Sequence, residues 1–323
     1  MVVGIKLSIA PMLELTDRHF RFFTRLLTKR TLLYTEMITT GAILHNKPEK
    51  FLEYNKEEHP IALQLGGSSP KDLAQCAKIG EDFGYDEINL NCGCPSERVQ
   101  SGSFGACLMR ESGLVAECVA AMQNAVKIPI SVKSRIGIDN EDSWDFFLNF
   151  VETIAKTGCK YFIIHARKAW LKGLSPKENR TIPPLSYETV FKLKEAHPDF
   201  QISLNGGVKN LSEAKNILQK TDSVMIGRAA YENPWLLANA DSEIFSEPYE
   251  NTKNQMEILN EFLPYTEAEF KKGTPPSIIT RHLMGLFHGM PGAKKYRTIL
   301  SEPCEPQHGV EKIKRATATL SFH

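Results

Sequence analysis

The sequence predicts an α/β protein in which a (β/α)8 TIM barrel is followed by a small C-terminal all-α helical domain. Eight short apolar runs alternate with amphipathic segments, polar side chains stand at the carboxyl ends of those runs, and the alternation stops after Leu237. Strands that alternate with helices form parallel βαβ units, and eight such units match a closed barrel of about 250 residues. A doubly wound sheet also alternates, but its fingerprint G-x-G-x-x-G is absent from the sequence, as is G-x-x-x-x-G-K-[ST].

Each predicted strand is a short run rich in β-branched and other apolar residues. The predicted strands are Leu7–Met12, Leu32–Met37, Ile61–Leu65, Glu87–Asn91, Ile130–Arg135, Tyr161–His165, Gln201–Asn205 and Ser223–Ile226. The helices predicted between them include Pro70–Phe83, Ser112–Val126, Trp144–Thr157, Ser186–His197 and Ser212–Gln219. In a barrel the carboxyl ends of the strands carry the active site. The polar residues expected at that edge are Gln64, Asn91, Lys133, Arg135, His165 and Asn205.

Beyond Leu237 the spacing of apolar residues is helical and predicts Asn254–Phe270, Ser277–Met290 and Gly309–Leu320 as helices. We therefore expect residues 1–240 to form a catalytic barrel and residues 241–323 to form a helical domain.

Composition and charge exclude several classes of protein. The 323 residues are 42% hydrophobic and 24% charged, which excludes a disordered, collagen-like or disulfide-rich miniature protein. With a net charge of +1, any binding to nucleic acid must come from local basic patches. No stretch approaches the roughly 18 apolar residues of a membrane span, and Asp17 and Arg18 do not fit a secretory signal, so we expect a cytoplasmic protein. Seven scattered cysteines without C-x-x-C or H-x-x-x-H spacing predict neither a disulfide framework nor a metal site.

Two glycine-containing turns follow the seventh and eighth predicted strands. Gly206 and Gly207 come directly after Asn205, and Gly227 precedes Arg228. Glycine lets the backbone N–H groups approach an anion closely, and arginine is a bidentate phosphate ligand. Either pair alone also fits a tight turn with a surface arginine. Because both pairs stand at the strands that bind phosphate in many barrels, we expect a phosphate here.

Lys133 at the end of the fifth predicted strand is costly inside a barrel mouth unless it meets negative charge. One interpretation is an anionic cofactor such as a reduced flavin, which a lysine stabilises electrostatically. The other is an ion pair with a barrel carboxylate such as Glu36.

The segment NLNCGCPS places Cys94 just beyond the fourth predicted strand, on a bend made by Gly93 and Pro95. Gly102 and Gly105 downstream indicate a loop that can act as a lid. Neither histidine nor lysine lies within several residues of Cys94, and an isolated thiol is mostly protonated at neutral pH. This environment favours a proton donor over a nucleophile. Alone, the motif also fits a metal hook or a simple turn.

Two groups of basic residues predict a docking surface for phosphates. The first follows the sixth predicted strand and contains Arg167, Lys168, Lys172, Lys177 and Arg180; the second lies in the helical domain and contains Arg281, Lys294, Lys295 and Arg297. Trp170 and Tyr296 lie within these groups and are candidates for stacking on bases. Either group alone would more often be an ordinary solvated face.

Taken together, Ala10-Pro11-Met12, LQLGG, NLNCGCPS, VKSRIG, IIHAR, NGG and IGRAAYENPW resemble the tRNA-dihydrouridine synthase family, and RKAWLKGLSPKENRTIPPL resembles its A subfamily. The resemblance covers Ala10 to Ser301 with the motifs in unbroken order. It implies an FMN-containing barrel with a helical tRNA-binding domain. It also implies reduction of uridine to 5,6-dihydrouridine in the D-loop of tRNA, at positions 20 and 20a, with NADPH as reductant.

The resemblance also assigns roles to residues. Hydride would pass from reduced FMN to carbon 6 of uracil, and Cys94 would give the proton to carbon 5. The residues implied to hold FMN are Ala10, Pro11, Met12, Gln64, Lys133, His165, Asn205, Gly206, Gly207, Gly227 and Arg228. The residues expected to contact the uracil or the tRNA are Asn91, Arg135, Arg167, Lys177, Arg180, Lys294, Lys295 and Arg297. A base in folded tRNA must be extruded to reach such a site.

Two alternative functions remain at this point. One is a flavin barrel that reduces a free pyrimidine or an enone, which would need neither basic group. The other is a tRNA-binding protein without catalytic activity, which would carry no flavin. The oligomeric state is not predicted.

Overall fold

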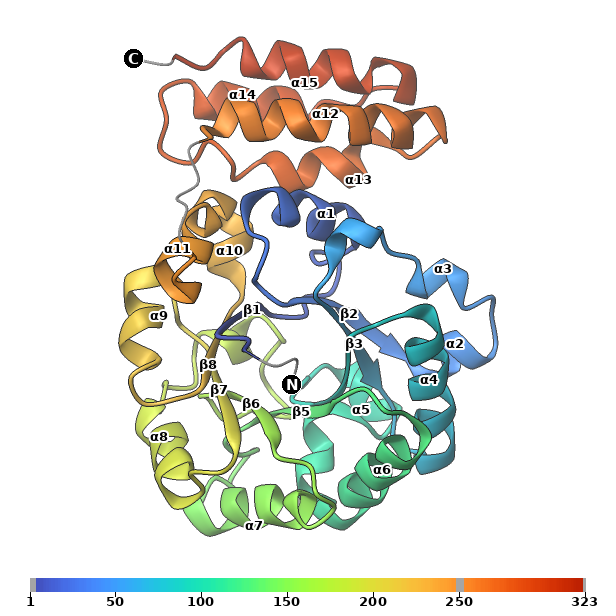
Figure 1. Ribbon diagram of the computed structural model, residues 1–323, viewed down its shortest axis with the longest axis vertical. Helices are drawn as coiled ribbons and strands as arrows, with labels where there is room; N and C mark the ends of the chain where they lie inside the picture. The colour runs from blue at the N-terminus through green and yellow to red at the C-terminus, as the bar shows by residue number, and fades with distance from the viewer. Residues whose placement is uncertain (1–3, 248–252, 322–323) are drawn as a thin grey trace.

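The computed structural model describes residues 4–247 and 253–321 of the chain. Its centre is a sheet of eight parallel strands in the order β1-β8-β7-β6-β5-β4-β3-β2 (Figure 1). The strands are β1 (Leu7–Ile9), β2 (Leu33–Thr39), β3 (Ile61–Gly66), β4 (Glu87–Cys92), β5 (Ile130–Arg135), β6 (Tyr161–His165), β7 (Gln201–Asn205) and β8 (Ser223–Ile226).

The sheet closes on itself through β1 and the residue before β2. The N–H of Ile9 donates to the carbonyl of Leu32 over 2.9 Å, and the N–H of Leu32 donates to the carbonyl of Leu7 over 3.1 Å. A ring of eight parallel strands with helices in the connections is a (β/α)8 barrel, so the predicted fold is confirmed.

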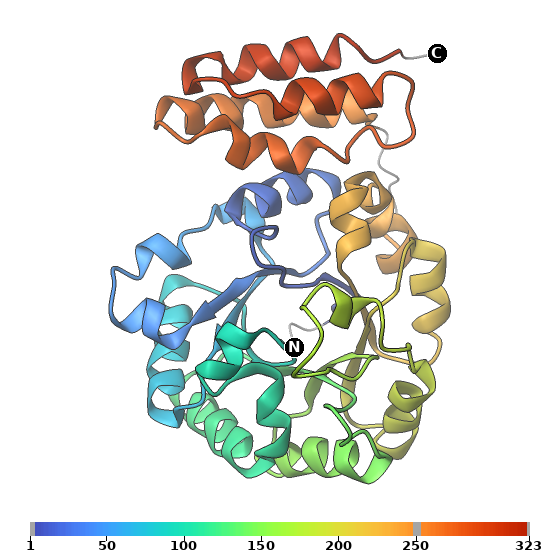
Figure 2. The same ribbon diagram turned by 180° about the vertical axis from the view of Figure 1, so that it is seen from behind.

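The helices of the barrel lie outside the ring of strands (Figures 1 and 2). They are α1 (Arg18–Leu27), α2 (Thr40–Leu44), α3 (Glu49–Leu52), α4 (Pro70–Phe83), α5 (Glu97–Ser101), α6 (Ser112–Ala125), α7 (Trp144–Ala155), α8 (Tyr187–Ala196), α9 (Leu211–Ile217), α10 (Arg228–Glu232) and α11 (Ala240–Phe245). Helix α4 shows why such segments fold as predicted: the Ser69 hydroxyl accepts from the N–H of Asp72, Pro70 opens the helix, and Gly84 ends it in the left-handed region.

The first predicted strand is too long. The structure ends β1 at Ile9, although Leu7–Met12 is a continuous apolar run. Pro11 has no N–H to give to a neighbouring strand. The N–H of Met12 donates to Oγ1 of Thr16 over 3.0 Å, so the chain enters a turn rather than extending the sheet.

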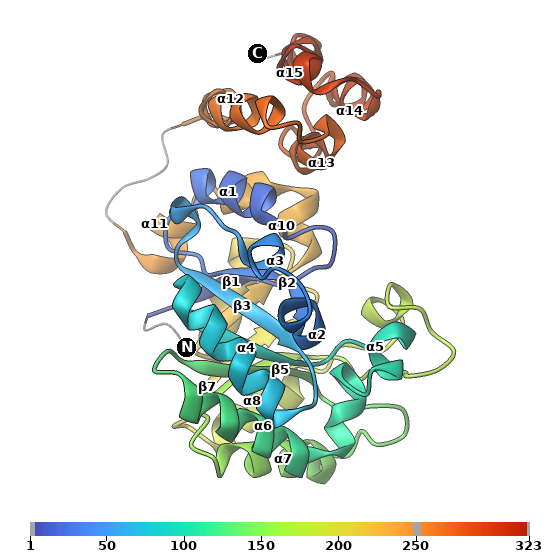
Figure 3. The same ribbon diagram turned by 90° about the vertical axis from the view of Figure 1, so that its right-hand side faces the viewer.

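The four helices after residue 253 stack on one another beside the barrel (Figure 3). They are α12 (Gln255–Lys271), α13 (Pro276–Thr280), α14 (Ala293–Ser301) and α15 (Gly309–Thr317). The predicted helix Ser277–Met290 is wrong beyond its first turns, because α13 ends at Thr280 and is followed by a 3-10 turn, Arg281–Leu283. Helix α14 was not predicted, although the residues that it buries, Ala293, Tyr296, Ile299 and Leu300, are apolar or aromatic and follow helical spacing.

The helical segment rests on α1 through a network around Asp17, the N-cap of that helix. Asp17 accepts from Nη2 of Arg281 over 2.6 Å and from Nε2 of His282 over 3.0 Å. Burial opposes the charged form, but the hydrogen bond and charge of His282 hold the pKa of Asp17 far below its ordinary value. Arg18 adds an ion pair with Glu269 of α12. These contacts join the two parts of the chain by buried charges.

The division into residues 1–240 and 241–323 stays a prediction, and one contact bears on it. Asp241 in α11 accepts from the hydroxyl of Thr28 over 2.6 Å and from the N–H of Lys29 over 2.6 Å, directly after α1. Helix α11 therefore belongs with the barrel helices. Within the described residues, no helix combines the length and apolar character needed to cross a membrane.

Candidate active site

A large cavity of about 2200 Å³ opens at the carboxyl ends of the strands. Helix α5 and the segment between β6 and α8 project from this end of the barrel (Figures 2 and 3). The predicted site residues that line the cavity are Ala10, Pro11, Met12, Gln64, Asn91, Cys94, Lys133, Arg135, His165, Arg167, Arg180, Asn205, Gly206, Gly207, Gly227 and Arg228. Four predicted tRNA contacts do not line it, namely Lys177, Lys294, Lys295 and Arg297.

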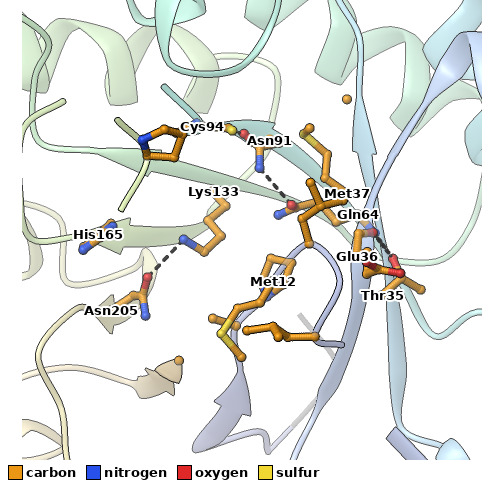
Figure 4. Close-up of a pocket in the computed structure, with 18 of the residues that line it drawn as sticks. Met12, Thr35, Glu36, Met37, Gln64, Asn91, Cys94, Lys133, His165 and Asn205 are labelled. Atoms are coloured by element: carbon orange, nitrogen blue, oxygen red, sulfur yellow. Dashed lines mark hydrogen bonds between the residues drawn. The ribbon is translucent and has the colours of Figure 1, made fainter. Parts of the chain in front are cut away.

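Lys133 lies at the centre of this cavity and is held by an amide (Figure 4). Its Nζ donates to Oδ1 of Asn205 over 3.0 Å, and Nδ2 of Asn205 donates to the carbonyl of Met225 over 2.8 Å, which fixes the amide with its oxygen toward the lysine. Burial, followed by the charge of Arg135, lowers the pKa of Lys133 to about 7. The site therefore resists a positive charge that has no counter-charge.

The interpretation of Lys133 as the partner of a carboxylate is wrong. Across residues 4–247 and 253–321, no Asp or Glu forms an ion pair with this lysine. Glu36 lines the same cavity, but its Oε1 accepts from the backbone N–H of Glu14. An ammonium group with an amide partner alone is suited to an anionic ligand.

A directional chain of hydrogen bonds crosses the barrel interior beneath the cavity. Nδ2 of Asn91 donates to Oε1 of Gln64 over 2.8 Å, and Nε2 of Gln64 donates to Oδ1 of Asn89 over 2.7 Å (Figure 4 shows the first bond). Asn89 then donates to Ser131 over 2.7 Å, and Ser131 donates to Glu87 over 2.5 Å. A carboxylate can only accept hydrogen bonds, so Glu87 at the end of the chain determines which way the amides of Asn89, Gln64 and Asn91 are oriented.

Asn91 also holds the segment that carries Cys94. Its Oδ1 accepts from the N–H groups of Gly93 and Cys94 over 3.1 and 3.0 Å. Gly105 packs against the carbonyl of Cys94, because a Cβ on Gly105 would lie 2.6 Å from that oxygen. The φ of Gly105 is +78°, in the left-handed region that favours glycine. The amide oxygen of Asn91 is fully used, so a substrate can receive a hydrogen bond only from its remaining N–H. Motion of the predicted lid at Gly102 and Gly105 stays a prediction.

His165 stands neutral against the glycine turn after β7. Burial, followed by the charges of Arg135 and Lys133, holds the pKa of His165 well below its ordinary value. A Cβ on Gly206 would lie 2.6 Å from Cδ2 of His165, and Gly206 has a φ of +110°. Glycine is therefore required for both the backbone conformation and the close approach of the imidazole. A neutral imidazole offers one donor and one acceptor to a ligand.

Three arginines, Arg167, Arg180 and Arg228, gather beside the two glycine turns and form what we term the arginine corner. Nη2 of Arg228 donates to the carbonyl of Arg180 over 3.2 Å, and Nη1 of Arg167 donates to the carbonyl of Pro183. Nε of Arg167 is buried without a hydrogen-bond partner. Burial and then the charge of Arg228 lower the pKa of Arg180, and within the described chain no carboxylate forms an ion pair with the corner. Such a cluster is suited to an anion such as phosphate.

Contact of Arg135 with the uracil or the tRNA stays a prediction, because this arginine lines the cavity, but the protein's own carbonyls hold its side chain. Its side chain is 3% exposed. Nε donates to the carbonyl of Gly93 over 2.9 Å, and Nη1 donates to the carbonyls of Lys168 and Asn179, each over 3.0 Å. Arg135 therefore ties the Cys94 segment to the segment after β6 rather than standing on a docking surface.

The second basic group also differs from expectation. Tyr296 cannot stack on a base, because it is fully buried and its hydroxyl donates to the carbonyl of Leu283 over 3.1 Å. Arg281 is paired with Asp17, as described above. In the first group, Lys168 is paired with Asp142 over 2.7 Å and lies over the ring of Trp170 at 4.5 Å from its centroid. Lys294, Lys295 and Arg297 are exposed on α14.

Sequence reasoning missed several residues of β2 that line the cavity, namely Thr35, Met37, Ile38 and Thr39. The predicted strand ended at Met37, whereas β2 continues to Thr39, so the true carboxyl end with Ile38 and Thr39 was not considered. Figure 4 shows Met37 beside Gln64 and Asn91.

Comparison with known families agrees with this arrangement. The model of the family described as dihydrouridine synthase (Dus) matches residues 8–321. The chain belongs to the dihydrouridine synthase family. Enzymes of this family are flavin-dependent oxidoreductases that reduce uridine in tRNA to dihydrouridine, and the chain is one of them.

Several curated relatives are similar to this dihydrouridine synthase over nearly their whole length. A tRNA-dihydrouridine(20/20a) synthase of Vibrio cholerae is 56% identical over 324 residues, which covers 100% of this chain and 98% of the relative. The protein of that name in Escherichia coli strain K12 is 57% identical over 92% of this chain and 86% of the relative. That of Shewanella oneidensis is 54% identical over 96% of this chain and 92% of the relative.

A solved structure supports the fold. A complex of 2-naphthoyl-CoA reductase with 2-naphthoyl-CoA superposes with a TM-score of 0.57 at 10% sequence identity, covering 74% of this chain and 50% of that chain. At this identity the likeness concerns the barrel architecture alone.

Proposed function

We propose that this dihydrouridine synthase uses FMN and NADPH to reduce uridines at positions 20 and 20a in the D-loop of tRNA. The positions follow the names of relatives that are 54–57% identical to it over nearly the whole chain. The observation that carries the chemistry is that one cavity brings together an ammonium without a counter-charge, the arginine corner and the thiol of Cys94.

The residues present fit FMN. Lys133, Gln64 and Asn205 offer a cation and two oriented amides at the centre of the cavity, with Ala10, Pro11 and Met12 on the adjoining wall. We assign the phosphate of FMN to the backbone of Gly206, Gly207 and Gly227 and to Arg228. The buried Nε of Arg167 beside them lacks a hydrogen-bond partner, which supports an anion at this place. Reduced flavin, when bound, supplies the hydride that adds to carbon 6 of uracil.

The chain's own residues supply the remaining chemistry. Cys94 gives its proton to carbon 5 of uracil, and the thiolate that is left regains a proton from solvent. The nearby cations Lys133 and Arg135 stabilise that thiolate electrostatically. The remaining N–H of Asn91 and the neutral imidazole of His165 hold the uracil edge in place.

The tRNA must be held so that the target nucleotide leaves its stack and enters the cavity. We propose that exposed Lys177 and Arg180 in the segment after β6 bind tRNA phosphates together with Lys294, Lys295 and Arg297 on α14. This assignment supports a division of labour in which the helical domain docks the tRNA. Because the substrate is tRNA, we propose that the protein acts in the cytoplasm.

The test is reconstitution with defined components. Unmodified tRNA transcript, FMN, NADPH and the purified protein should yield dihydrouridine at positions 20 and 20a, mapped by mass spectrometry of nuclease fragments. Free uridine should be reduced far more slowly. Reduction of free uridine at the rate of tRNA would favour the small-molecule ene-reductase, and a colourless protein that binds tRNA without product would favour the non-catalytic alternative.

A further inference from the structure

A single exposed apolar side chain is ordinary on a folded protein, so its position decides whether it points to a function. The large apolar side chains exposed among residues 4–247 and 253–321 all follow barrel strands, at the end of the barrel that carries the cavity. They are Leu13, Ile182 and Leu185, with exposed fractions of 69%, 58% and 37%. All three lie in segments that follow carboxyl ends of strands, the first after β1 and the others after β6. Leu13 and Leu185 line the cavity and Ile182 does not.

Leu185 packs on the glycine turn that follows β7, whereas Leu13 does not. A Cβ on Gly207 would lie 2.5 Å from Cδ1 of Leu185, so this leucine packs over the backbone that we assign to the cofactor. Leu13 is the most exposed of the three and lies in the segment that follows β1.

The backbone holds Leu13 in this exposed position. The N–H groups of Leu15 and Thr16 both donate to the carbonyl of Met12 over 3.0 Å, which closes a tight turn around Leu13. Glu14 has a φ of +64°, and its N–H donates to the carboxylate of Glu36. A non-glycine residue in the left-handed region costs free energy and persists where surrounding contacts impose it. The turn therefore presents the leucine at the rim instead of letting it fold onto the barrel.

The partner of Leu13 must be apolar and must arrive with the substrate. A phosphate cannot serve, because the side chain has neither charge nor donor. Extrusion of a nucleotide leaves a gap in the stack, with the face of the next base uncovered, and apolar side chains fill such gaps in other nucleic-acid complexes. The exposed guanidinium of Arg180, which lines the same cavity and which we assign to the tRNA, provides charge that attracts a nucleic-acid backbone to the barrel mouth.

We propose that Leu13 packs against the base next to the extruded uridine and so stabilises the extruded state. The inference rests on the proposed function and adds a residue that touches the tRNA outside the uracil pocket. Leu13 thus contributes to how readily a given neighbouring sequence is accepted.

The test compares Leu13→Ala with Ile182→Ala, which removes an exposed aliphatic side chain that does not line the cavity. Leu13→Ala should lower single-turnover formation of dihydrouridine about tenfold, with thermal stability and flavin content unchanged, whereas Ile182→Ala should lose less than about twofold. The defect of Leu13→Ala should disappear with a tRNA that carries an abasic nucleotide beside the target uridine, because no base remains for the leucine to contact. A defect that persists with the abasic tRNA, or an equal effect of both variants, would overturn the inference.

A binding measurement needs no turnover. 2-Aminopurine placed beside the target uridine should change its fluorescence on binding to the flavin-loaded wild type and to Ile182→Ala, and by about half as much or less on binding to Leu13→Ala. Equal changes for all three proteins would overturn the role of Leu13. Absence of dihydrouridine from the wild type, with the fluorescence difference present, would overturn the proposed function and leave the contact standing.

Discussion

Replacing Lys133 by methionine should stabilise the flavin-free protein while weakening FMN binding and uridine reduction. The ammonium group lies inside the cavity with an amide as its hydrogen-bond partner. In the flavin-free protein this charge is unfavourable, and a methionine of similar shape removes it. The same charge is what an anionic cofactor requires, so stability and function are opposed at this position.

The magnitude follows from the pKa of Lys133, which burial lowers from an ordinary 10.5 to about 7. At about 1.4 kcal/mol for each unit, keeping the charge in the folded protein costs at most about 5 kcal/mol. The lost hydrogen bond to Asn205 offsets about 1 kcal/mol. Because part of the side chain faces the open cavity, solvent screens the charge, and we expect a net gain of about 2 kcal/mol at pH 6.

The gain should depend on pH in a defined direction. Between pH 7 and 10.5 the unfolded lysine keeps its proton and the folded lysine loses it, so wild-type stability rises with pH in this window. The advantage of Lys133→Met is therefore full below about pH 7 and vanishes toward pH 10.5.

Urea unfolding of both flavin-free proteins at several pH values measures this difference. Lys312→Met is a matched control, since Nζ of this buried lysine donates to the carbonyls of Leu300 and Glu302 over 3.1 and 2.9 Å. It should destabilise the protein, because two carbonyls lose their donor. A Lys133→Met protein that is less stable than wild type at pH 6, or a difference that does not change between pH 6 and pH 10, would refute the reasoning.

Three further predictions concern the walls of the site and the surfaces around it. Gly206→Ala should destabilise the protein by about 2 kcal/mol and weaken FMN binding at least about tenfold, because alanine at positive φ is strained and its Cβ meets the neighbouring imidazole; calorimetry and flavin titration measure both, and wild-type affinity would contradict it. Asp17→Asn should lower stability by about 2 kcal/mol at neutral pH, because the amide keeps the helix cap but loses the charge that its partners require. Since the pKa of Asp17 is lowered, its contribution is present above the ordinary value of 3.8 and is lost as pH falls, so acid unfolding of wild type and variant should converge; a constant difference would count against the network. Joint replacement of Lys177 and Arg180 by alanine should weaken tRNA binding and reduce its salt slope by about one for each phosphate that the variant no longer neutralises, and an unchanged slope would remove these residues from the docking surface.

Much of the barrel could be predicted because its strands are simple apolar runs. The predicted ranges of β5, β6, β7 and β8 agree with the structure at both ends. The helices after residue 253 were harder to predict from the sequence, because tertiary contacts set where they begin and end. A Cβ on Gly285 would lie 2.4 Å from the carbonyl of Glu232, so a close approach to the barrel replaces the helix that the apolar spacing predicts there.

Part of the candidate site could also be predicted, because the carboxyl ends of most strands were placed correctly or within a residue. The rule that carboxyl ends of barrel strands carry function found Gln64, Lys133, His165 and Asn205, which all line the cavity. The position of Arg135 followed from this rule, but its contacts did not, because they join carbonyls from segments that are distant in the chain. The burial of Tyr296 was equally hidden, since its two charged neighbours made α14 resemble a solvated face.

The central claim is that Cys94 supplies the proton that completes reduction of an extruded uridine. Single-turnover reduction of unmodified tRNA by flavin-loaded Cys94→Ala, with NADPH, tests it most directly. We expect the variant to keep its flavin and to oxidise NADPH at the wild-type rate, while dihydrouridine forms at least about a hundredfold more slowly. Product at the wild-type rate from this variant would contradict the account.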